Sequence, residues 1–113
     1  MNFSIKERQK GFVTILELYG GLDAHTAPQL DAKLKESLAA GKTKLAIIMS
    51  GLEMISSAGW SIFIETALQC KEKGGDIRFA GMKSDAAKIF KIMGLNSMIK
   101  SFESADEAAD SFN

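Results

Sequence analysis

The sequence has little of what small enzymes and disulfide-rich domains depend on. Its 113 residues include one cysteine, one histidine and one proline. The lone cysteine, Cys70, excludes an internal disulfide and any metal site built from several cysteines, which suits a reducing compartment. The sequence also lacks a Gly-rich phosphate loop ending in Lys-Ser or Lys-Thr and a Cys-x-x-Cys motif. These absences argue against a self-contained enzyme, and we predict no catalytic residue, cofactor or metal site.

An excess of charge of one sign is missing as well. Lysine plus arginine number 14, as do aspartate plus glutamate, so the formal net charge is zero. A neutral domain favours neither nucleic acid nor an anionic membrane as its partner. The charged start MNFSIKERQK has no signal-peptide core, and the longest apolar run, LAIIM, is too short to cross a bilayer. We expect a cytoplasmic protein without a membrane span, folded as one domain over residues 1–113.

The first half of the chain reads as a hairpin, a helix and a buried strand. The alternation around residues 3–6 and the β-branched run 11–20 predict two antiparallel strands with a turn near residues 10–11. In residues 21–42 the pattern changes to helical spacing, with Thr26 as a possible cap, and the helix should end near residue 41. The run KLAIIMSG, residues 44–51, is continuously apolar, which is typical of a central strand covered on both faces.

Two further helix and strand pairs follow. A helix over residues 58–73 would bury Phe63, Ala67 and Cys70, and DIRFAG would form the next strand. The segment 83–94 predicts a short helix that Ser84 caps, and the residues expected to face inward are Ile89, Phe90 and Met93. SMIKSF is a weak last strand, and Ser104 and Glu107 form a capping-box pattern before a final helix. The fold class is therefore α/β, a mixed sheet of about five strands with about four helices in the order β-β-α-β-α-β-α-β-α.

The stretch MISSAGWSIF, residues 54–63, carries the candidate site. It places Ser56 and Ser57 between the central strand and a helix, where open α/β folds keep their sites. One serine could simply cap the helix, and such a cap stabilises a helix by about 1 kcal/mol. Alternatively, a serine there could accept a phosphate, because a helix N-terminus favours an anion. The two interpretations are compatible for different serines.

Other residues are open to plainer interpretations. Asp23, in the loop LDAHTA, is either a turn residue that accepts backbone hydrogen bonds or part of a partner-facing surface. His25 in the same loop is a lone histidine without a catalytic constellation. Trp60 is either a core anchor or an exposed contact residue. Cys70 lies on the apolar stripe of its helix, which indicates a buried, inert thiol.

Three stretches of the sequence carry a family likeness. They are GGLDAHTAPQL, SGLEMISSAGWSIF and AAKIFKIMGLNSMIKSFES, and the likeness that rests on them runs nearly end to end along the chain. With them the chain resembles the STAS domain of bacterial anti-sigma factor antagonists, which also forms the tails of sulphate transporters. The middle stretch matches a motif that reads Asp-Ser-Ser/Ala-Gly in the antagonists.

The resemblance implies a partner switch. Its phosphoacceptor would be Ser57, and the partner would be an anti-sigma factor with serine kinase activity. The unphosphorylated domain would bind this kinase and free a sigma factor, and phosphorylation would release the domain. The chain would then be a substrate and binding module, and not a catalyst. The residues expected around the contact surface are Asp23, Ser56, Ala58, Gly59 and Trp60.

The sequence departs from the family pattern in two places. The motif aspartate is Ser56, and apolar residues around 48–49 replace an acidic residue usual near the end of the third strand. If the kinase needs the missing carboxylate, phosphorylation would be slow or absent. The alternative is a non-switching STAS scaffold subunit of a stress-signalling complex or of a lipid-transport ATPase.

Overall fold

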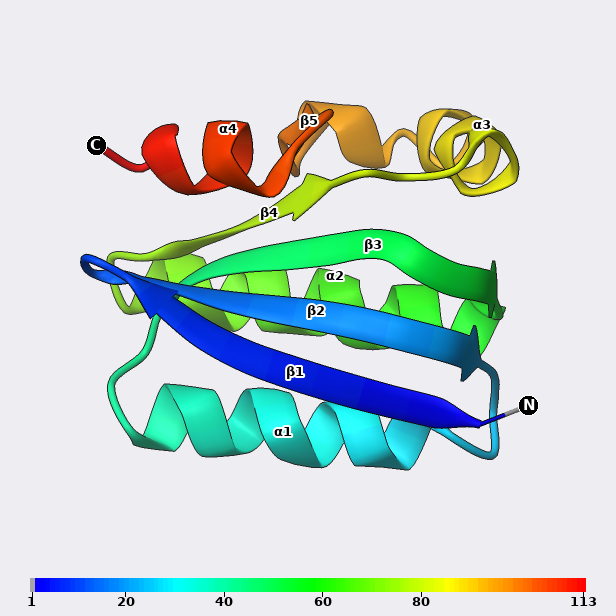
Figure 1. The fold of residues 1–113 in the computed structure, drawn as a ribbon, viewed down its shortest axis with the longest axis horizontal. Coiled ribbons are helices and arrows are strands. Elements are labelled where there is room, and N and C mark those ends of the chain that lie inside the picture. Colours follow the sequence, from blue (N-terminus) through cyan, green and yellow to red (C-terminus); the bar gives the residue numbers. More distant parts are fainter. Residues whose placement is uncertain (1) are drawn as a thin grey trace.

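The computed structural model describes residues 2–113, which form one mixed sheet and four α-helices (Figure 1). The elements are β1 (Phe3–Lys10), β2 (Val13–Leu22), α1 (Ala27–Ala39), β3 (Lys44–Ile55), α2 (Ser57–Glu72), β4 (Asp76–Ala80), α3 (Ser84–Ile92), a 3-10 helix (Leu95–Ser97), β5 (Ser101–Phe102) and α4 (Ala105–Asp110). The predicted order of strands and helices is confirmed.

The five strands lie in the sheet in their order along the chain. β1 and β2 form an antiparallel hairpin, whereas β2, β3, β4 and β5 run parallel to one another. Parallel neighbours need a crossover, and α1, α2 and α3 provide the three crossovers. The carboxyl ends of β2, β3 and β4 therefore share one edge of the sheet.

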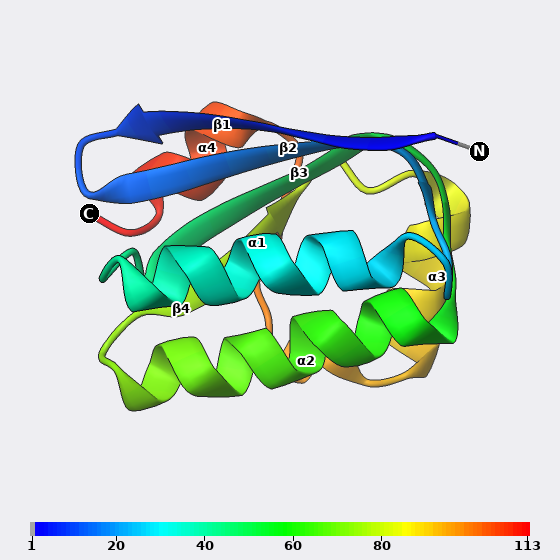
Figure 2. The same cartoon turned by 90° about the horizontal axis from the view of Figure 1, so that it is seen from below.

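The helices cover the two faces of the sheet unequally. α1 and α2 lie side by side on one face, and α4 lies on the other (Figure 2). The larger core is between the sheet and the α1–α2 layer, and its fully buried members include Leu16, Leu34, Ile47, Phe63 and Phe79. A smaller core under α4 contains Val13, Ile15, Ala46, Ile48, Ala80, Ala108 and Ala109. β3 is covered on both faces, which explains its continuous apolar run.

Helix α3 corrects two predictions. Its N-cap is Lys83, with an extended backbone at ψ 161°, so Ser84 is already inside the helix and the prediction that it caps is wrong. Phe90 is buried as expected, but Ile89 is 41% and Met93 is 46% exposed, so their predicted inward orientation is also wrong. Only a narrow stripe of this short helix, centred on Phe90, is buried in the core.

The segment after α3 forms less strand than predicted. Residues 95–97 are a 3-10 helix, and only Ser101–Phe102 pair with β4. The capping box is confirmed, because the backbone N–H of Glu107 donates to Ser104 Oγ at 3.1 Å. The last helix therefore begins where the sequence indicates, although the strand before it is only two residues long.

Candidate functional site

The two halves of the predicted site meet because β2 and β3 end together. Leu22 pairs with Ile55 at the last position of the β2–β3 register. One residue further on, the backbone N–H of Ser56 donates to the carbonyl of Leu22 at 2.8 Å. The loop that begins at Asp23 and the serine pair therefore leave the sheet side by side.

Asp23 organises its own loop. Its Oδ1 accepts hydrogen bonds from the backbone N–H groups of His25 and Thr26, both at 2.9 Å. The Thr26 N–H is the main cause that holds the pKa of Asp23 below its usual range, and the His25 N–H adds to it. Thr26 Oγ1 donates to the carbonyl of Gly21 at 2.7 Å and makes no capping bond to α1. The turn role weighed for Asp23 is thus the one observed, and its carboxylate stays ionised at neutral pH.

The two serines at the start of α2 have different environments. Ser56 is the N-cap residue, with an extended backbone at ψ 171°, yet α2 has no side-chain cap hydrogen bond. Its Oγ is buried and has no hydrogen-bond partner among the described residues. Ser57 is the first residue of the helix, and it is exposed. The interpretation of a serine as a simple side-chain cap is therefore not supported, and of the two residues Ser57 is the exposed one, whereas the hydroxyl of Ser56 is buried.

The start of α2 is favourable to an anion. Its first turn contains no acidic residue and no side chain occupies its free N–H groups. Unpaired backbone N–H groups and the helix dipole together make the N-terminus of a helix attractive to a phosphate or carboxylate. Both features converge on the turn that begins with Ser57.

The remaining motif residues fix α2 against the sheet. A Cβ on Gly59 would lie 2.7 Å from Leu22 Cδ2, so the absence of a side chain permits the close approach. Trp60 is 2% exposed, and its ring is 6.2 Å from those of Phe63 and Phe90. Trp60 is therefore a core anchor. Because Gly59 and Trp60 are both buried, we correct the expectation that they contribute contact surface.

The structure also shows the burial of the three remaining residues that the sequence singled out, Ala58, His25 and Cys70. Ala58 is half-buried and packs against the larger core, so it offers only a small surface. His25 is exposed in the Asp23 loop. Cys70 is fully buried, which confirms that part of its prediction, and burial raises the pKa of its thiol to about 11.

Two hollows lie near this end of the sheet. The smaller, of about 70 Å³, is lined by Met49, Leu52, Glu53, Met54, Ile55, Lys83, Asp85 and Ala86. It begins next to the serine pair and reaches α3, a neighbour that the sequence did not indicate. Only the folded chain brings α3 there, because no motif spacing links the two segments.

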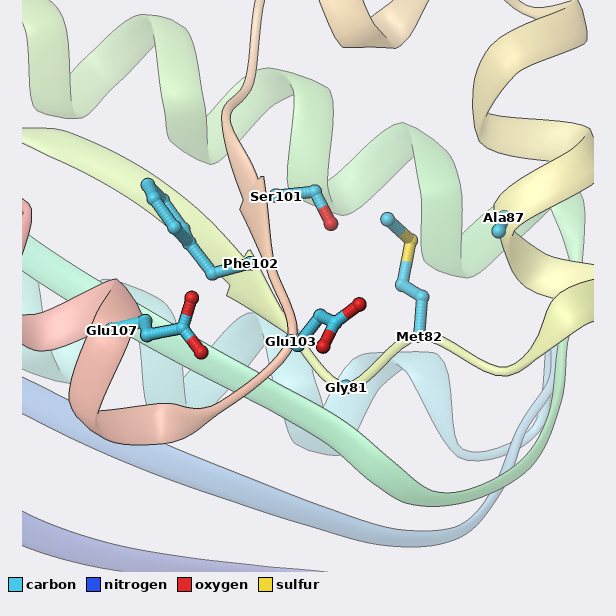
Figure 3. A pocket seen from close by; sticks show the side chains of 7 residues that line it. All are labelled: Gly81, Met82, Ala87, Ser101, Phe102, Glu103 and Glu107. Atoms are coloured by element: carbon cyan, nitrogen blue, oxygen red, sulfur yellow. The ribbon is translucent and has the colours of Figure 1, made fainter.

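The larger hollow, of about 660 Å³, is lined by Gly81, Met82, Ala87, Ser101, Phe102, Glu103 and Glu107. In Figure 3 the side chains of Ser101, Met82 and Glu103 point toward one another on the α3 side of β5. This hollow contains none of the predicted site residues. Across residues 2–113, no group of three or more histidine, cysteine, aspartate or glutamate residues is placed to hold a metal ion. Within the same range, no helix is long and apolar enough to cross a membrane.

The chain is similar in sequence and in fold to several known proteins. The anti-sigma-B factor antagonist of Listeria monocytogenes is 27% identical over 106 residues, which cover 88% of this chain and 89% of that protein. An anti-sigma factor antagonist from Mycobacterium paratuberculosis has a structure with a TM-score of 0.89 at 19% identity, covering 97% of this chain and 93% of that one. The phosphorylated form of the Bacillus cell fate determinant SpoIIAA has a TM-score of 0.77 at 19% identity, covering 97% and 100%.

The family assignment extends over nearly the whole sequence. The STAS domain family matches residues 4–108, which include β1 from its second residue, all of β2 to β5 and the start of α4. The match covers both the Asp23 loop and the serine pair. The chain therefore belongs to the STAS domain family, and its relatives in sequence and in structure are named anti-sigma factor antagonists.

Proposed function

We propose that this chain is an anti-sigma factor antagonist that binds an anti-sigma factor with serine kinase activity and is released by phosphorylation of Ser57. The observation that carries the proposal is the contrast between the two serines. Ser57 is exposed in the first turn of α2, whereas the hydroxyl of Ser56 is buried. A kinase needs access to the hydroxyl oxygen, so Ser57 is the acceptor.

The position of Ser57 provides a physical reason for release. Phosphorylation adds about −1.5 to −2 charges at neutral pH. The free N–H groups of α2 can hold that charge within this domain, so phosphorylation does not unfold it. A partner surface shaped for a neutral hydroxyl gains an uncompensated dianion instead, and the complex dissociates.

Asp23 adds to the same surface. Its loop leaves β2 beside the serine pair, and its pKa is lowered by the backbone N–H groups of the loop. An ionised carboxylate in the loop beside Ser57 would add to the negative charge that phosphorylation creates at this surface. Asp23 therefore contributes negative charge to the contact surface. Ser56 and Ala58, both half-buried, contribute a smaller, uncharged part of the same surface.

The names of two related proteins support the proposal. The Listeria protein is named for its action on an anti-sigma factor, and SpoIIAA has a structure in its phosphorylated form. Carried to this chain, these descriptions imply a cytoplasmic regulator of transcription. In this role the chain is the substrate of the kinase and has no catalytic residue of its own.

One observation favours a second function. The motif aspartate is absent, and the Oγ of Ser56, which stands in its place, is buried without a hydrogen-bond partner among the described residues. If recognition by the kinase requires that carboxylate, the domain would bind its partner whatever the state of Ser57. It would then be a non-switching subunit of a stress-signalling complex or of a lipid-transport ATPase.

The deciding experiment combines capture and phosphoryl transfer. Wild-type protein and the Ser57→Asp variant serve as parallel baits in native lysate, and the proteins retained by wild type alone are purified. Each is incubated with ATP and the wild-type, Ser57→Ala or Ser61→Ala chain, and intact mass is measured. We expect one phosphoryl group on wild type and on Ser61→Ala, and none on Ser57→Ala. Equal retention of every partner by both baits would support the scaffold function instead.

A further inference from the structure

The outer flank of α3 exposes apolar side chains that no sequence pattern predicted to be outside. Ile92 is 84% exposed, Met93 46% and Ile89 41%. Residues spaced three and four apart lie on one side of a helix, so these three form a continuous stripe. Single exposed apolar residues are common on soluble proteins, but a contiguous group is typical of an interaction surface. We call Ile89, Ile92 and Met93 the α3 stripe.

The α3 stripe adjoins the Ser57 surface. The hollow of about 70 Å³ is lined by Ile55, which precedes the serine pair, and by Asp85, one helical turn before Ile89. Met54, 37% exposed, lines the same hollow. In both views of the fold, α3 lies at the end of the molecule where α2 begins (Figures 1 and 2). A partner bound over Ser57 is therefore within reach of α3.

The charges around the stripe indicate the chemistry of its partner. Segment 83–93 contains the exposed lysines Lys83, Lys88 and Lys91 against the single acid Asp85. None of the ion pairs within residues 2–113 uses any of these three lysines. A second copy of this chain that docked through the same face would bring lysine against lysine, whereas an acidic partner would pair with them. The surface thus combines apolar area with unpaired positive charge.

We propose that the α3 stripe and its lysines dock an acidic amphipathic helix of a partner protein. Apolar residues of that helix cover Ile89 and Ile92, and its carboxylates face Lys88 and Lys91. The identity of the partner as the kinase rests on the proposed function, but the surface and its chemistry do not. In that complex the helix provides a second contact, separate from the hydroxyl of Ser57.

The test uses two synthetic amphipathic helical peptides with the same leucine stripe, one with glutamate and the other with lysine at the polar positions. Each is titrated into the isotope-labelled 113-residue chain, and backbone amide shifts are followed by NMR. We expect the glutamate peptide to shift residues 83–93 and to bind at least tenfold more tightly than the lysine peptide. Equal affinity for both peptides, or shifts confined to other elements, would overturn the proposal.

Matched variants distinguish binding at the α3 stripe from nonspecific binding to other exposed apolar or charged residues. Ile89→Ser with Ile92→Ser should weaken binding of the glutamate peptide at least tenfold, because the apolar contact is lost. Phe12→Ser is the control, since Phe12 is 90% exposed in the hairpin turn, between β1 and β2. Lys88→Glu with Lys91→Glu should also weaken binding, whereas Lys73→Glu, just past the other end of α2, should not. Equal losses in a variant and its control would contradict docking on α3.

Failure of this inference is distinguishable from failure of the proposed function. If Ser57 accepts no phosphate but the glutamate peptide binds at α3, the docking surface stands and the phosphoswitch does not. If the captured kinase phosphorylates Ser57 and the stripe variants bind both peptide and kinase like wild type, the switch stands and the docking surface is refuted.

Discussion

Gly59 faces Leu22 so closely that a Cβ added at Gly59 would lie 2.7 Å from Leu22 Cδ2 and 2.8 Å from Leu22 Cγ. Leu22 is completely buried, so it cannot move aside without disturbing its neighbours. The glycine of the serine motif thus has a packing role, because it lets the first turn of α2 approach the end of β2. That contact sets where Ser57 stands relative to the Asp23 loop.

We therefore expect Gly59→Ala to destabilise the fold. Overpacking costs about 1 to 3 kcal/mol, and the higher helix propensity of alanine returns up to about 1 kcal/mol. Because Leu22 is completely buried, the overpacking cost should lie in the upper part of that range, about 2 to 3 kcal/mol. The net loss in the free energy of unfolding should therefore be about 1 to 2 kcal/mol, measured by urea denaturation. Ser61→Ala, on the exposed side of the same helix, is the control and should stay within about 0.5 kcal/mol. A Gly59→Ala variant as stable as wild type would mean that Leu22 relaxes without cost.

Truncation of Phe63 in α2 should strongly destabilise the fold. It is completely buried, and its ring centroid lies 5.1 Å from that of Phe79 in an edge-to-face arrangement. Phe63→Ala removes an aromatic ring from a packed core, and the expected loss is about 3 to 5 kcal/mol. Thermal or urea denaturation measures it directly. A loss below about 1 kcal/mol would show that this side of α2 is not part of the core.

Binding of the kinase should depend on charge at Ser57. Ser57→Ala keeps a neutral side chain and should retain the affinity of wild type, whereas Ser57→Asp introduces an anion and should bind more weakly. Isothermal titration with the captured kinase compares the two variants. Equal affinity of both variants would count against a switch at this position, even if the serine can be phosphorylated.

Asp23 should make stability depend on pH in the acid range. Backbone hydrogen bonds lower its pKa from an ordinary value of 3.8, so the folded state favours the ionised form. Its contribution is therefore present above that value and is lost as pH falls through the lowered pKa of the folded state.

The matched comparison for Asp23 is Asp23→Asn, which keeps an oxygen acceptor but cannot titrate. Wild type should have the higher Tm at pH 7, and the difference from Asp23→Asn should shrink below a pH of 3.8. Glu7, whose pKa is lowered by Lys33 and Lys42, titrates in both proteins and cancels in the comparison. A Tm difference that does not change with pH would mean that the charge of Asp23 does not stabilise the turn.

Cys70 should be unreactive until the protein unfolds. Its thiol is fully buried and its pKa is raised to about 11, so little thiolate exists at pH 8. A thiol-reactive dye should therefore not label the native protein, but it should label the urea-unfolded protein within minutes. Rapid labelling of the native state would reveal local opening of α2.

The sequence predicted most elements because their patterns are local. The continuous apolar run of β3, the leucine spacing of α1 and the Ser104–Glu107 box each specify a structure within a few residues, and each is observed. Trp60 shows the limit of such patterns. Its burial depends on Phe79 and Phe90, which come from other elements, so the sequence left core and surface both open.

The errors lie where tertiary contacts outweigh local pattern. Ile89 and Met93 have helical spacing with Phe90, but α3 sits at the end of the sheet, where the core beneath it is only wide enough for a narrow stripe. The strand predicted at 97–102 shrinks to two residues because β4 pairs with it only there. In both cases the amount of neighbouring surface was decisive, and no single segment encodes that amount.

By itself, the sequence determined the order of strands and helices, the neutral charge and the serine motif, because these depend on residues close together along the chain. The tertiary structure decided which serine is accessible, since the hydroxyl of Ser56 is buried where the chain passes from β3 to α2, whereas Ser57, the next residue, is exposed. It also brought α3 beside the start of α2. That placement follows from the parallel strand order, in which β3 and β4 end at the same edge of the sheet.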